Sequence, residues 1–489
     1  MPHPWDQDHL HEECGIFGIY GHTDAAAHVA LGLHALQHRG QEAAGIVSCD
    51  HENDGLFYVH KALGLVGDSF SAESVIGQLK GMSAIGHVRY STTGDTLLRN
   101  VQPLFAEYHF GGFAVAHNGN LTNAQTLRQK LVERGCIFQS TSDTEVIIHL
   151  IAMAKGGTLM ERLVETLKQI EGAYSLVALT QDSVIGIRDP LGVRPLVIGK
   201  LGDSHIFASE TCALDIIGAQ YVREVKPGEI VTVNKSGMSS LMPFAPSKQR
   251  FCVFEYVYFA RPDSRVEEKS VYDARKRIGI ELAKESPADA DMIVPVPDSG
   301  VPAAIGYANE SGIPFDLGII RNHYVGRTFI EPTDQVRNLG VKLKHNANAA
   351  SLRGKRVVLV DDSIVRGTTS KKIVAMVREA GAKEVHMRIA SPPTTHSCFY
   401  GVDTPERDKL LAAKHSVEEM AKLIGVDSLA FLSIDGLYRA MGEAKREAGA
   451  PQYCDACFTG DYPIALTDFG DTPAPKRLSR LNVSGRKFA

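Results

Sequence analysis

Apolar runs of strand length alternate with amphipathic, helix-length segments along most of this 489-residue chain. The clearest run, residues 357–360, is four apolar and mostly β-branched side chains, typical of a strand buried on both faces of a parallel sheet. Residues 370–380 follow with helical spacing, and Gly381 suits the end of that helix. Residues 292–296 repeat the strand pattern, and residues 271–284 repeat the helical one. The C-terminal half therefore predicts an α/β domain with a mainly parallel sheet.

The N-terminal half predicts shorter elements. Residues 14–20 (CGIFGIY) read as a buried strand, residues 24–38 carry apolar side chains at helical spacing, and further short strands and helices extend to residue 233. A chain of this length is too long for a single core. We expect a polar leader over 1–13, domains over 14–235 and 250–463, an irregular linker over 236–249 and a poorly ordered Pro-, Ser- and basic-rich tail over 464–489.

Composition narrows the class of protein. Hydrophobic residues make up 44% and charged residues 22%, as in ordinary globular enzymes, and the net charge of −5 argues against a nucleic-acid surface. No apolar stretch is long enough to span a membrane, and the N-terminus lacks the apolar centre of a signal peptide. Eight cysteines in a chain of this size suit a reducing compartment. We therefore expect a cytoplasmic enzyme.

The most informative stretch, residues 355–370 (KRVVLVDDSIVRGTTS), contains a candidate phosphate cradle. Asp361 and Asp362 come where the strand ends, and a small-residue turn opens the next helix, whose N-terminus favours an anion. The two carboxylates cannot bind phosphate themselves, so they must face sugar hydroxyls or a divalent metal. A solvated acidic turn is the alternative.

This stretch resembles the signature of type I phosphoribosyltransferases, which bind phosphoribosyl pyrophosphate (PRPP). The resemblance implies Mg²⁺ on Ser299, Asp361 and Asp362, with Ser299 lying in the turn that follows the strand at 292–296. By itself that turn could equally be free of ligand. The implied PRPP-binding residues are Asp361, Asp362, Ser363, Arg366, Gly367, Thr368 and Thr369.

Residues 321–345 are basic and only weakly periodic. They are either a solvated surface or a flap that closes over the diphosphate and excludes water. We expect the flap.

Five short motifs appear in order in the N-terminal half: CGIFG (14–18), LQHRGQEAAGI (36–46), GHVRYSTTG (86–94), HNGN (117–120) and STSDTE (140–145). Together they resemble the glutaminase domain of the N-terminal-nucleophile amidotransferases across residues 14–235. The resemblance implies a four-layer αββα fold with Cys14 as nucleophile.

Glutamine chemistry explains why such a cysteine would stand at a mature N-terminus. The thiol attacks the side-chain amide and needs a base. Removal of residues 1–13 would free the α-amine of Cys14, whose reference pKa of roughly 7.7–8.0 suits proton transfer near neutral pH. While the leader is attached, that nitrogen is a non-basic amide.

The resemblance also assigns the other parts of the glutamine site. Asn118 and Gly119 would bind the oxyanion, although an Asn-Gly pair can also be a simple turn. Arg89 would bind the glutamine carboxylate and Asp143 its ammonium, with Arg39 and Gly40 lining the pocket. Asp143 lies in a capping-box pattern, so a purely helix-capping role is the alternative.

Cys454 and Cys457 form a C-x-x-C motif that could be a redox dithiol, a zinc half-site or an iron–sulfur half-site. The contexts FCVFEYVYFARPDS, HSCFYGVD and CDACFTGDYP resemble the iron–sulfur branch of the glutamine PRPP amidotransferases. That resemblance implies a [4Fe–4S] cluster on Cys252, Cys398, Cys454 and Cys457, with zinc and free thiols as alternatives. The other cysteines besides Cys14 have no assigned role.

Both halves together resemble the glutamine PRPP amidotransferases over nearly the whole chain. The implied reaction converts glutamine, PRPP and water to 5-phosphoribosylamine, glutamate and pyrophosphate, the first committed step of purine synthesis, with ammonia passing through the interior. Feedback inhibition by purine nucleotides and a homotetramer are implied as well. Alternatives are another glutamine amidotransferase, which would lack the PRPP signature, and a PRPP-sensing regulator, which would lack Cys14.

Overall fold

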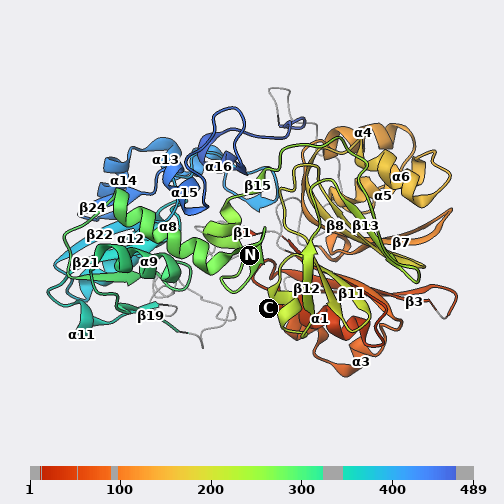
Figure 1. Ribbon diagram of the computed structural model, residues 1–489, viewed down its shortest axis with the longest axis horizontal. Coiled ribbons are helices and arrows are strands. Elements are labelled where there is room, and N and C mark those ends of the chain that lie inside the picture. The colour runs from red at the N-terminus through yellow and green to blue at the C-terminus, as the bar shows by residue number, and fades with distance from the viewer. Residues whose placement is uncertain (1–10, 13, 52, 90–96, 323–344, 470–489) are drawn as a thin grey trace.

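The computed structural model describes residues 11–12, 14–51, 53–89, 97–322 and 345–469. Figure 1 shows two lobes, with the N-terminal half (red to yellow) on the right and the C-terminal half (green to blue) on the left. Within the described ranges, no helix is long and apolar enough to cross a membrane.

The N-terminal domain contains two antiparallel sheets packed face to face. The seven-stranded sheet has the order β12-β10-β11-β2-β5-β3-β4, and the six-stranded sheet has the order β14-β13-β9-β8-β7-β6. The first comprises β2 (Cys14–Tyr20), β3 (Ala43–Asp50), β4 (Leu56–Leu63), β5 (Ser83–Arg89), β10 (Val197–Leu201), β11 (Ser204–Ala208) and β12 (Gln220–Glu224). The second comprises β6 (Leu104–Tyr108), β7 (Gly111–Leu121), β8 (Gly172–Thr180), β9 (Ser183–Arg188), β13 (Ile230–Asn234) and β14 (Gly237–Leu241).

Helices cover the outer faces of both sheets. The seven-stranded sheet packs on α1 (Ala25–Ala35), with α2 (Val66–Phe70), α3 (Glu73–Ile76) and α7 (Cys212–Asp215) beside it. The six-stranded sheet packs on α4 (Ala124–Glu133), α5 (Thr144–Met153) and α6 (Leu159–Leu167). Buried side chains such as Ile16, Ile85, Val177 and Leu179 fill the space between the sheets. The predicted αββα fold is confirmed.

The C-terminal domain is built on a four-stranded parallel sheet of order β18-β21-β22-β24. Its strands are β18 (Met292–Pro295), β21 (Arg356–Asp361), β22 (Glu384–Ile389) and β24 (Ser428–Phe431). One face packs on α12 (Thr368–Glu379) and α14 (Val417–Ile424). The other packs on α8 (Val271–Glu285), α9 (Val301–Ser311) and α15 (Ile434–Ala440). Both faces are buried, as the apolar strand at 357–360 predicts.

Short elements complete the described chain. In the N-terminal domain these include η1 (Leu98–Asn100). In and around the C-terminal domain they are β15 (Phe251–Cys252), the π-helix η2 (Glu255–Phe259), β16 (Arg265–Val266), β17 (Lys269–Ser270), β19 (Ile319–Arg321), β20 (His345–Ala347), α11 (Ala349–Leu352), β23 (Val402–Asp403), η3 (Arg407–Lys409), α13 (Leu411–Lys414), β25 (Tyr453–Cys454) and α16 (Ala456–Thr459). Inside the predicted leader, β1 (His11–Glu12) pairs with β23.

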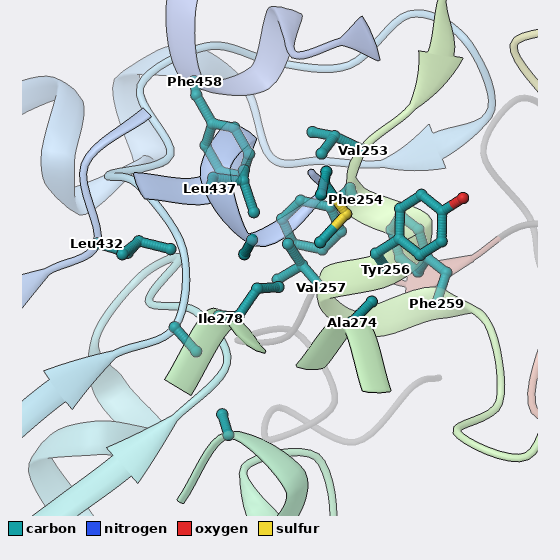
Figure 2. Packing of buried hydrophobic residues seen from close by; sticks show 14 of the residues in the cluster. Val253, Phe254, Tyr256, Val257, Phe259, Ala274, Ile278, Leu432, Leu437 and Phe458 are labelled. Carbon is teal, nitrogen blue, oxygen red and sulfur yellow. The ribbon is translucent and has the colours of Figure 1, made fainter. Parts of the chain in front are cut away.

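The largest apolar cluster holds η2 against the C-terminal domain. Phe254 and Val257 pack with Ile278 of α8, Leu437 of α15 and Phe458 of α16 (Figure 2). Ala173 and Val193 of the N-terminal domain belong to the same cluster, so it continues across the boundary between the domains. Residues 251–260 are thus a buried bridge between the two folds.

Two sequence predictions differ from the structure, and a third lies mostly outside the described residues. The predicted linker begins with β14, an exposed edge strand that is hydrogen-bonded to β13. The sequence of β14 lacks the apolar alternation of a half-buried strand, so the pattern did not predict it. The predicted tail begins in contact with the N-terminal domain, where the Asp468 carboxylate accepts hydrogen bonds from the backbone of Gln125 and Thr126 at 2.7 and 3.0 Å. Most of the predicted flap, residues 323–344, lies outside the described residues, and the strands β19 and β20 beside it pair antiparallel.

The expected capping box over residues 142–145 is also wrong. Asp143 is the N-cap of α5 and accepts a hydrogen bond from Thr144 N at 2.8 Å. Glu145 reaches the preceding loop instead, where it accepts from Gln139 N at 2.7 Å and Ser140 N at 2.8 Å. The loop thus competes successfully for the carboxylate that the motif assigns to the cap.

Two candidate active sites

Cys14 is the first residue of β2, in the interior of the seven-stranded sheet, and is 8% exposed. The register places Cys14 directly opposite Arg89 of β5. Two residues further along β2, Ile16 N donates a hydrogen bond to Ser209 Oγ at 3.0 Å. The candidate nucleophile and the candidate carboxylate-binding arginine are therefore neighbours on adjacent strands.

Gly40 lies against the same point of the sheet. A Cβ at Gly40 would come within 2.6 Å of Arg89 N, so only glycine permits this approach. The Arg39 side chain is fully buried, and it pairs with Glu210 and, at 2.7 Å, with Glu255 Oε2. The guanidinium of Arg39 thus lies among carboxylates of both domains, while Gly40 touches the candidate glutamine site.

Asn118 and Gly119 lie in β7 of the facing sheet. Asn118 Nδ2 donates to Ser209 Oγ at 3.4 Å, the same hydroxyl that Ile16 N contacts, which ties β7 to the start of β2. Gly119 has φ of +142°, and a Cβ there would lie 2.0 Å from Ala173 O. The strand is therefore distorted at the candidate oxyanion donor, and only glycine fits.

Asp143 lies beside this strand. Its Oδ2 accepts a hydrogen bond from Leu121 N at 3.0 Å and is 3.6 Å from His117 Nδ1. Burial lowers the pKa of His117, and burial lowers the pKa of His87 to about 3. These two imidazoles are therefore neutral near pH 7. Asp143 combines helix capping with contacts to His117 and Leu121, the residues of β7 on either side of Asn118 and Gly119.

The candidate PRPP site lies at the carboxyl end of β21. Asp361 and Asp362 are almost fully buried, and Ser299 Oγ donates to Asp362 Oδ1 at 2.6 Å. Ser363 Oγ donates to Asp362 Oδ2, also at 2.6 Å. The turn that carries Ser299 fits closely, since a Cβ at Gly300 would lie 2.3 Å from Val360 O. The structure thus brings all three predicted Mg²⁺ ligands together at the carboxyl ends of the neighbouring strands β18 and β21.

The helix α12 begins after a short turn that follows these acids. Gly367 is its N-cap with φ of +78°, and Thr368 and Thr369 form its first turn. First-turn N–H groups lack partners within the helix and favour an anion. Tyr258 also feels the charge of these acids: burial, and then the Asp362 carboxylate, raise the pKa of its phenol.

The four cysteines of the predicted cluster come together from three segments. Cys252 is opposite Cys454 in the parallel pair β15–β25, and one small cavity is lined by Cys252, Cys398, Cys454 and Cys457. Burial raises the pKa of the Cys252 thiol to about 12. Within the described parts of the chain, no group of three His, Cys, Asp or Glu side chains could hold a metal ion. Four cysteine sulfurs at one cavity are donors that suit an iron–sulfur cluster or zinc. The residue types therefore fit such a metal centre, although the side chains as placed do not form one.

Sequence reasoning missed the buried polar residues that join these parts: Ser209, Glu210, Arg194 and Glu255. Arg39 and Glu255 are 216 residues apart, and Arg194 and Glu255 are 61 apart. No motif spacing marks such pairs, and only the packing of the two domains reveals them.

The fold and the two sites define a glutamine amidotransferase joined to a phosphoribosyltransferase. A family model of the glutamine amidotransferase domain matches residues 87–215, and one of the phosphoribosyl transferase domain matches residues 267–391. Amidophosphoribosyltransferase from Rhizobium etli is 59% identical over 99% of this chain and 98% of its own. The one from Bacillus subtilis is 49% identical over 95% of this chain and 97% of its own. The chain belongs to the amidophosphoribosyltransferase family.

Solved structures agree with this assignment. The allosteric regulatory enzyme of purine biosynthesis superposes with a TM-score of 0.89 at 48% identity, covering 94% of this chain and 98% of that one. Glutamine PRPP amidotransferase from B. subtilis, complexed with ADP and GMP, gives a TM-score of 0.88 at 48% identity over 94% and 99%. The resemblance drawn from the motifs is confirmed: the chain is a glutamine-dependent enzyme of purine biosynthesis. Because the relatives span both domains, a regulator or another type of amidotransferase is excluded.

Proposed function

We propose that Cys14 and the acids at the end of β21 are the two reaction centres of one coupled synthesis. Glutamine, PRPP and water give 5-phosphoribosylamine, glutamate and pyrophosphate. The observation that carries the proposal is the presence, in one chain, of Cys14 opposite Arg89 and of an acidic pair at the end of β21, followed by a turn and the helix α12. Each arrangement suits one half-reaction.

In the first half-reaction Cys14 Sγ attacks the side-chain carbonyl of glutamine while its proton passes to the α-amine of the same residue. Asn118 Nδ2 and Gly119 N–H stabilise the oxyanion, in line with the distorted strand at Gly119. The α-ammonium then gives that proton to the departing nitrogen, so the tetrahedral intermediate expels ammonia and leaves a thioester, which water hydrolyses to glutamate and free thiol. Arg89 binds the glutamine carboxylate and Asp143 its ammonium, with Arg39 and Gly40 behind them.

The base in this step exists only if residues 1–13 are removed. In the full chain the nitrogen of Cys14 is a peptide amide and cannot accept the thiol proton. Removal frees an amine whose ordinary pKa, roughly 7.7–8.0, lies close to neutral pH. Cys14 therefore lacks its base until the leader is removed.

In the second half-reaction ammonia attacks C1 of PRPP and pyrophosphate leaves. Asp361 and Asp362 stabilise positive charge that develops on the ribose, and the start of α12 with Arg366 and Ser363 binds phosphate. Mg²⁺, held by Ser299, Asp361 and Asp362, would neutralise the departing diphosphate, because oxygen donors at the ends of two neighbouring strands suit this ion. The ammonia must stay unprotonated, which the apolar side chains around residues 251–260 support by excluding water.

Cys252, Cys398, Cys454 and Cys457 are proposed to bind a [4Fe–4S] cluster that joins three distant segments. Their convergence on one cavity supports the proposal, and zinc is the alternative that the same thiolates would accept. The role is structural, because thiolate–metal bonds that link remote segments stabilise the fold.

Feedback inhibition by purine nucleotides is proposed because a solved relative contains ADP and GMP. A homotetramer and a cytoplasmic location are further proposals, and relatives from Arabidopsis thaliana and Vigna aconitifolia are named as chloroplastic.

The direct test is product balance. Purified protein given glutamine, PRPP and Mg²⁺ should release glutamate and pyrophosphate in equal amounts, and ammonia should replace glutamine in pyrophosphate release. Glutamate release that never brings pyrophosphate release, with PRPP present, would contradict the coupled synthesis.

A further inference from the structure

One carboxylate of the C-terminal domain lies among arginines of the N-terminal domain. Glu255, the first residue of η2, is fully buried. Its Oε2 accepts a hydrogen bond from Arg39 Nη2 at 2.7 Å, and its Oε1 accepts one from Arg194 Nη1 at 2.9 Å. Both arginines are at most 1% exposed. A buried carboxylate that pairs with two buried guanidinium groups across a domain boundary fixes all three side chains.

The first arginine leads to the glutamine-binding strand. Arg39 is held between Glu210 and Glu255, and the next residue, Gly40, lies against the backbone of Arg89. Arg89 is in turn the register partner of Cys14. A shift of Arg39 therefore moves Gly40 against the strand end on which glutamine would bind.

The second arginine leads to the oxyanion donor. Arg194 Nε donates to Tyr400 O at 3.0 Å, and its Nη2 donates to Gly401 O. Gly401 touches Gly119, because a Cβ at Gly401 would lie 2.9 Å from Gly119 Cα. Glu255 thus holds the arginine that presses a loop of the C-terminal domain onto the proposed oxyanion hole.

The element that carries Glu255 is itself clamped. Arg275 of α8 donates from Nε to Tyr256 O at 2.8 Å and from Nη2 to the carbonyls of Tyr258 and Ala260 at 2.6 and 2.7 Å. The backbone of η2 is therefore fixed to the C-terminal domain. The carboxylate reaches the N-terminal domain from a rigid support, which precise positioning requires.

We propose that Glu255 is a positioning residue for the glutaminase site, supplied by the phosphoribosyltransferase domain. It touches neither substrate, but it sets the backbone at Arg89 and at Gly119 through Arg39 and Arg194. The proposal rests on the function proposed above for Cys14, Arg89 and Gly119. Its consequence is that loss of Glu255 impairs the use of glutamine and spares the use of ammonia.

The experiment compares Glu255→Gln with Glu255→Asp in the full chain. Glu255→Gln leaves two buried guanidinium groups short of one negative charge and should lower kcat/KM for glutamine by about 10- to 100-fold, since misplacement of a site by about 1 Å has effects of that size. Ammonia-dependent synthesis should stay within about twofold of wild type. Glu255→Asp keeps the charge and should recover part of the glutamine-dependent rate.

Glu229→Gln is the matched control. Glu229 is also a buried glutamate paired through both oxygens with one arginine, Arg223, at 2.7 and 2.8 Å, and its other contacts are Lys226 N and Ser240 Oγ. Both routes of synthesis should keep their wild-type ratio in this variant. If Glu255→Gln is insoluble, Arg194→Lys replaces it, because lysine keeps the charge but cannot make the paired contacts to Tyr400 and Gly401.

Equal losses on glutamine and on ammonia would overturn the proposal in favour of a general structural role, and so would an unchanged glutamine-dependent rate. A wild-type chain that makes no product from glutamine would instead contradict the proposed function. The two failures are therefore distinguishable.

Discussion

The two candidate sites are built in opposite ways. The PRPP site comes from one continuous stretch, residues 361–369, with Ser299 added from the neighbouring strand end. The glutamine site is assembled from β2, β5, β7 and the start of α5, with a loop of the other domain packed onto Gly119. A site made by one strand–turn–helix unit is defined by its own domain, whereas an assembled site depends on how the two domains pack. Substitutions should therefore affect one route of synthesis or both, according to the site.

The largest effect is expected from Cys14→Ala. Loss of the nucleophile should lower glutamine-dependent synthesis by at least about 10³-fold, since a positioned nucleophile carries most of the rate. Ammonia-dependent synthesis should remain, because the PRPP site lies in the other domain. Steady-state assays with each nitrogen donor test this, and loss of both rates in folded protein would contradict two separable sites.

Asp362→Asn should affect both routes. The substitution removes a charge that contacts Ser299 and Ser363 at the proposed ribose and Mg²⁺ site, so we expect about a 10²-fold loss with either nitrogen donor. Pyrophosphate release measures it. Glutamine hydrolysis in the absence of PRPP serves as the internal control for an intact N-terminal domain. Full ammonia-dependent activity would make Asp362 a structural residue only.

Cys457→Ser should reduce stability rather than one reaction. If four thiolates join three segments through a cluster, the variant loses iron, protease resistance and both activities together. Cys136→Ser is the matched control, because Cys136 lies far along the chain from the cavity and does not line it. Iron and sulfide analysis of anaerobically purified protein, with limited proteolysis, provides the measurement. Stoichiometric zinc without iron, or a fully active metal-free protein, would exclude the cluster.

The smallest effect on synthesis is expected from a second carboxylate at the domain boundary. Glu224 Oε1 accepts a hydrogen bond from Glu267 N at 3.0 Å, and burial, with the nearby Glu267 carboxylate, raises the pKa of Glu224 to about 8. A carboxyl whose pKa is raised in the folded state keeps its proton to higher pH there than in the unfolded chain. Its contribution to the free energy of unfolding therefore falls as the pH rises from about 4.5 to about 8.

Glu224→Gln removes that loss. The variant should lie close to wild type near pH 5 and exceed its unfolding free energy by at most about 5 kcal/mol at pH 8.5, since one pKa unit is worth about 1.4 kcal/mol and the pKa is raised from 4.5 to about 8. Thermal unfolding at the two pH values measures the difference. The ratio of the two synthetic routes should not change, and a changed ratio would mean that the whole boundary, and not Glu255 in particular, sets the glutamine site.

How far the sequence could predict the molecule follows from the same contrast. The strand at 357–360, the acids after it and the helix that begins at Thr368 are neighbours in the chain, so local pattern was enough to predict the strand–turn–helix unit that carries the candidate PRPP site. Cys14, Arg89 and Asn118 were accessible through their motifs, but their proximity depends on strand register and sheet packing. The pairing of Glu255 could not be predicted, because the local sequence around a glutamate in an apolar segment is the same whether its side chain is solvated or paired with Arg39.

Edge and terminal segments also escaped prediction for physical reasons. β14 is paired on one side only and fully exposed, so its hydrophobic pattern resembles that of a loop. Residues 464–469 are held by contacts with α4 and Tyr400. Such long-range contacts cannot be predicted from local composition.

The central claim is that Cys14 acts as nucleophile with its own α-amine as base. Intact-mass analysis of active enzyme, before and after inactivation by a glutamine analogue that alkylates thiols, tests it most directly. The account predicts a chain that begins at Cys14 and gains one equivalent of label on its N-terminal peptide, with glutamine-dependent activity lost and ammonia-dependent activity kept. Fully active protein that still carries Met1, or label on another cysteine with the same selective loss, would contradict it.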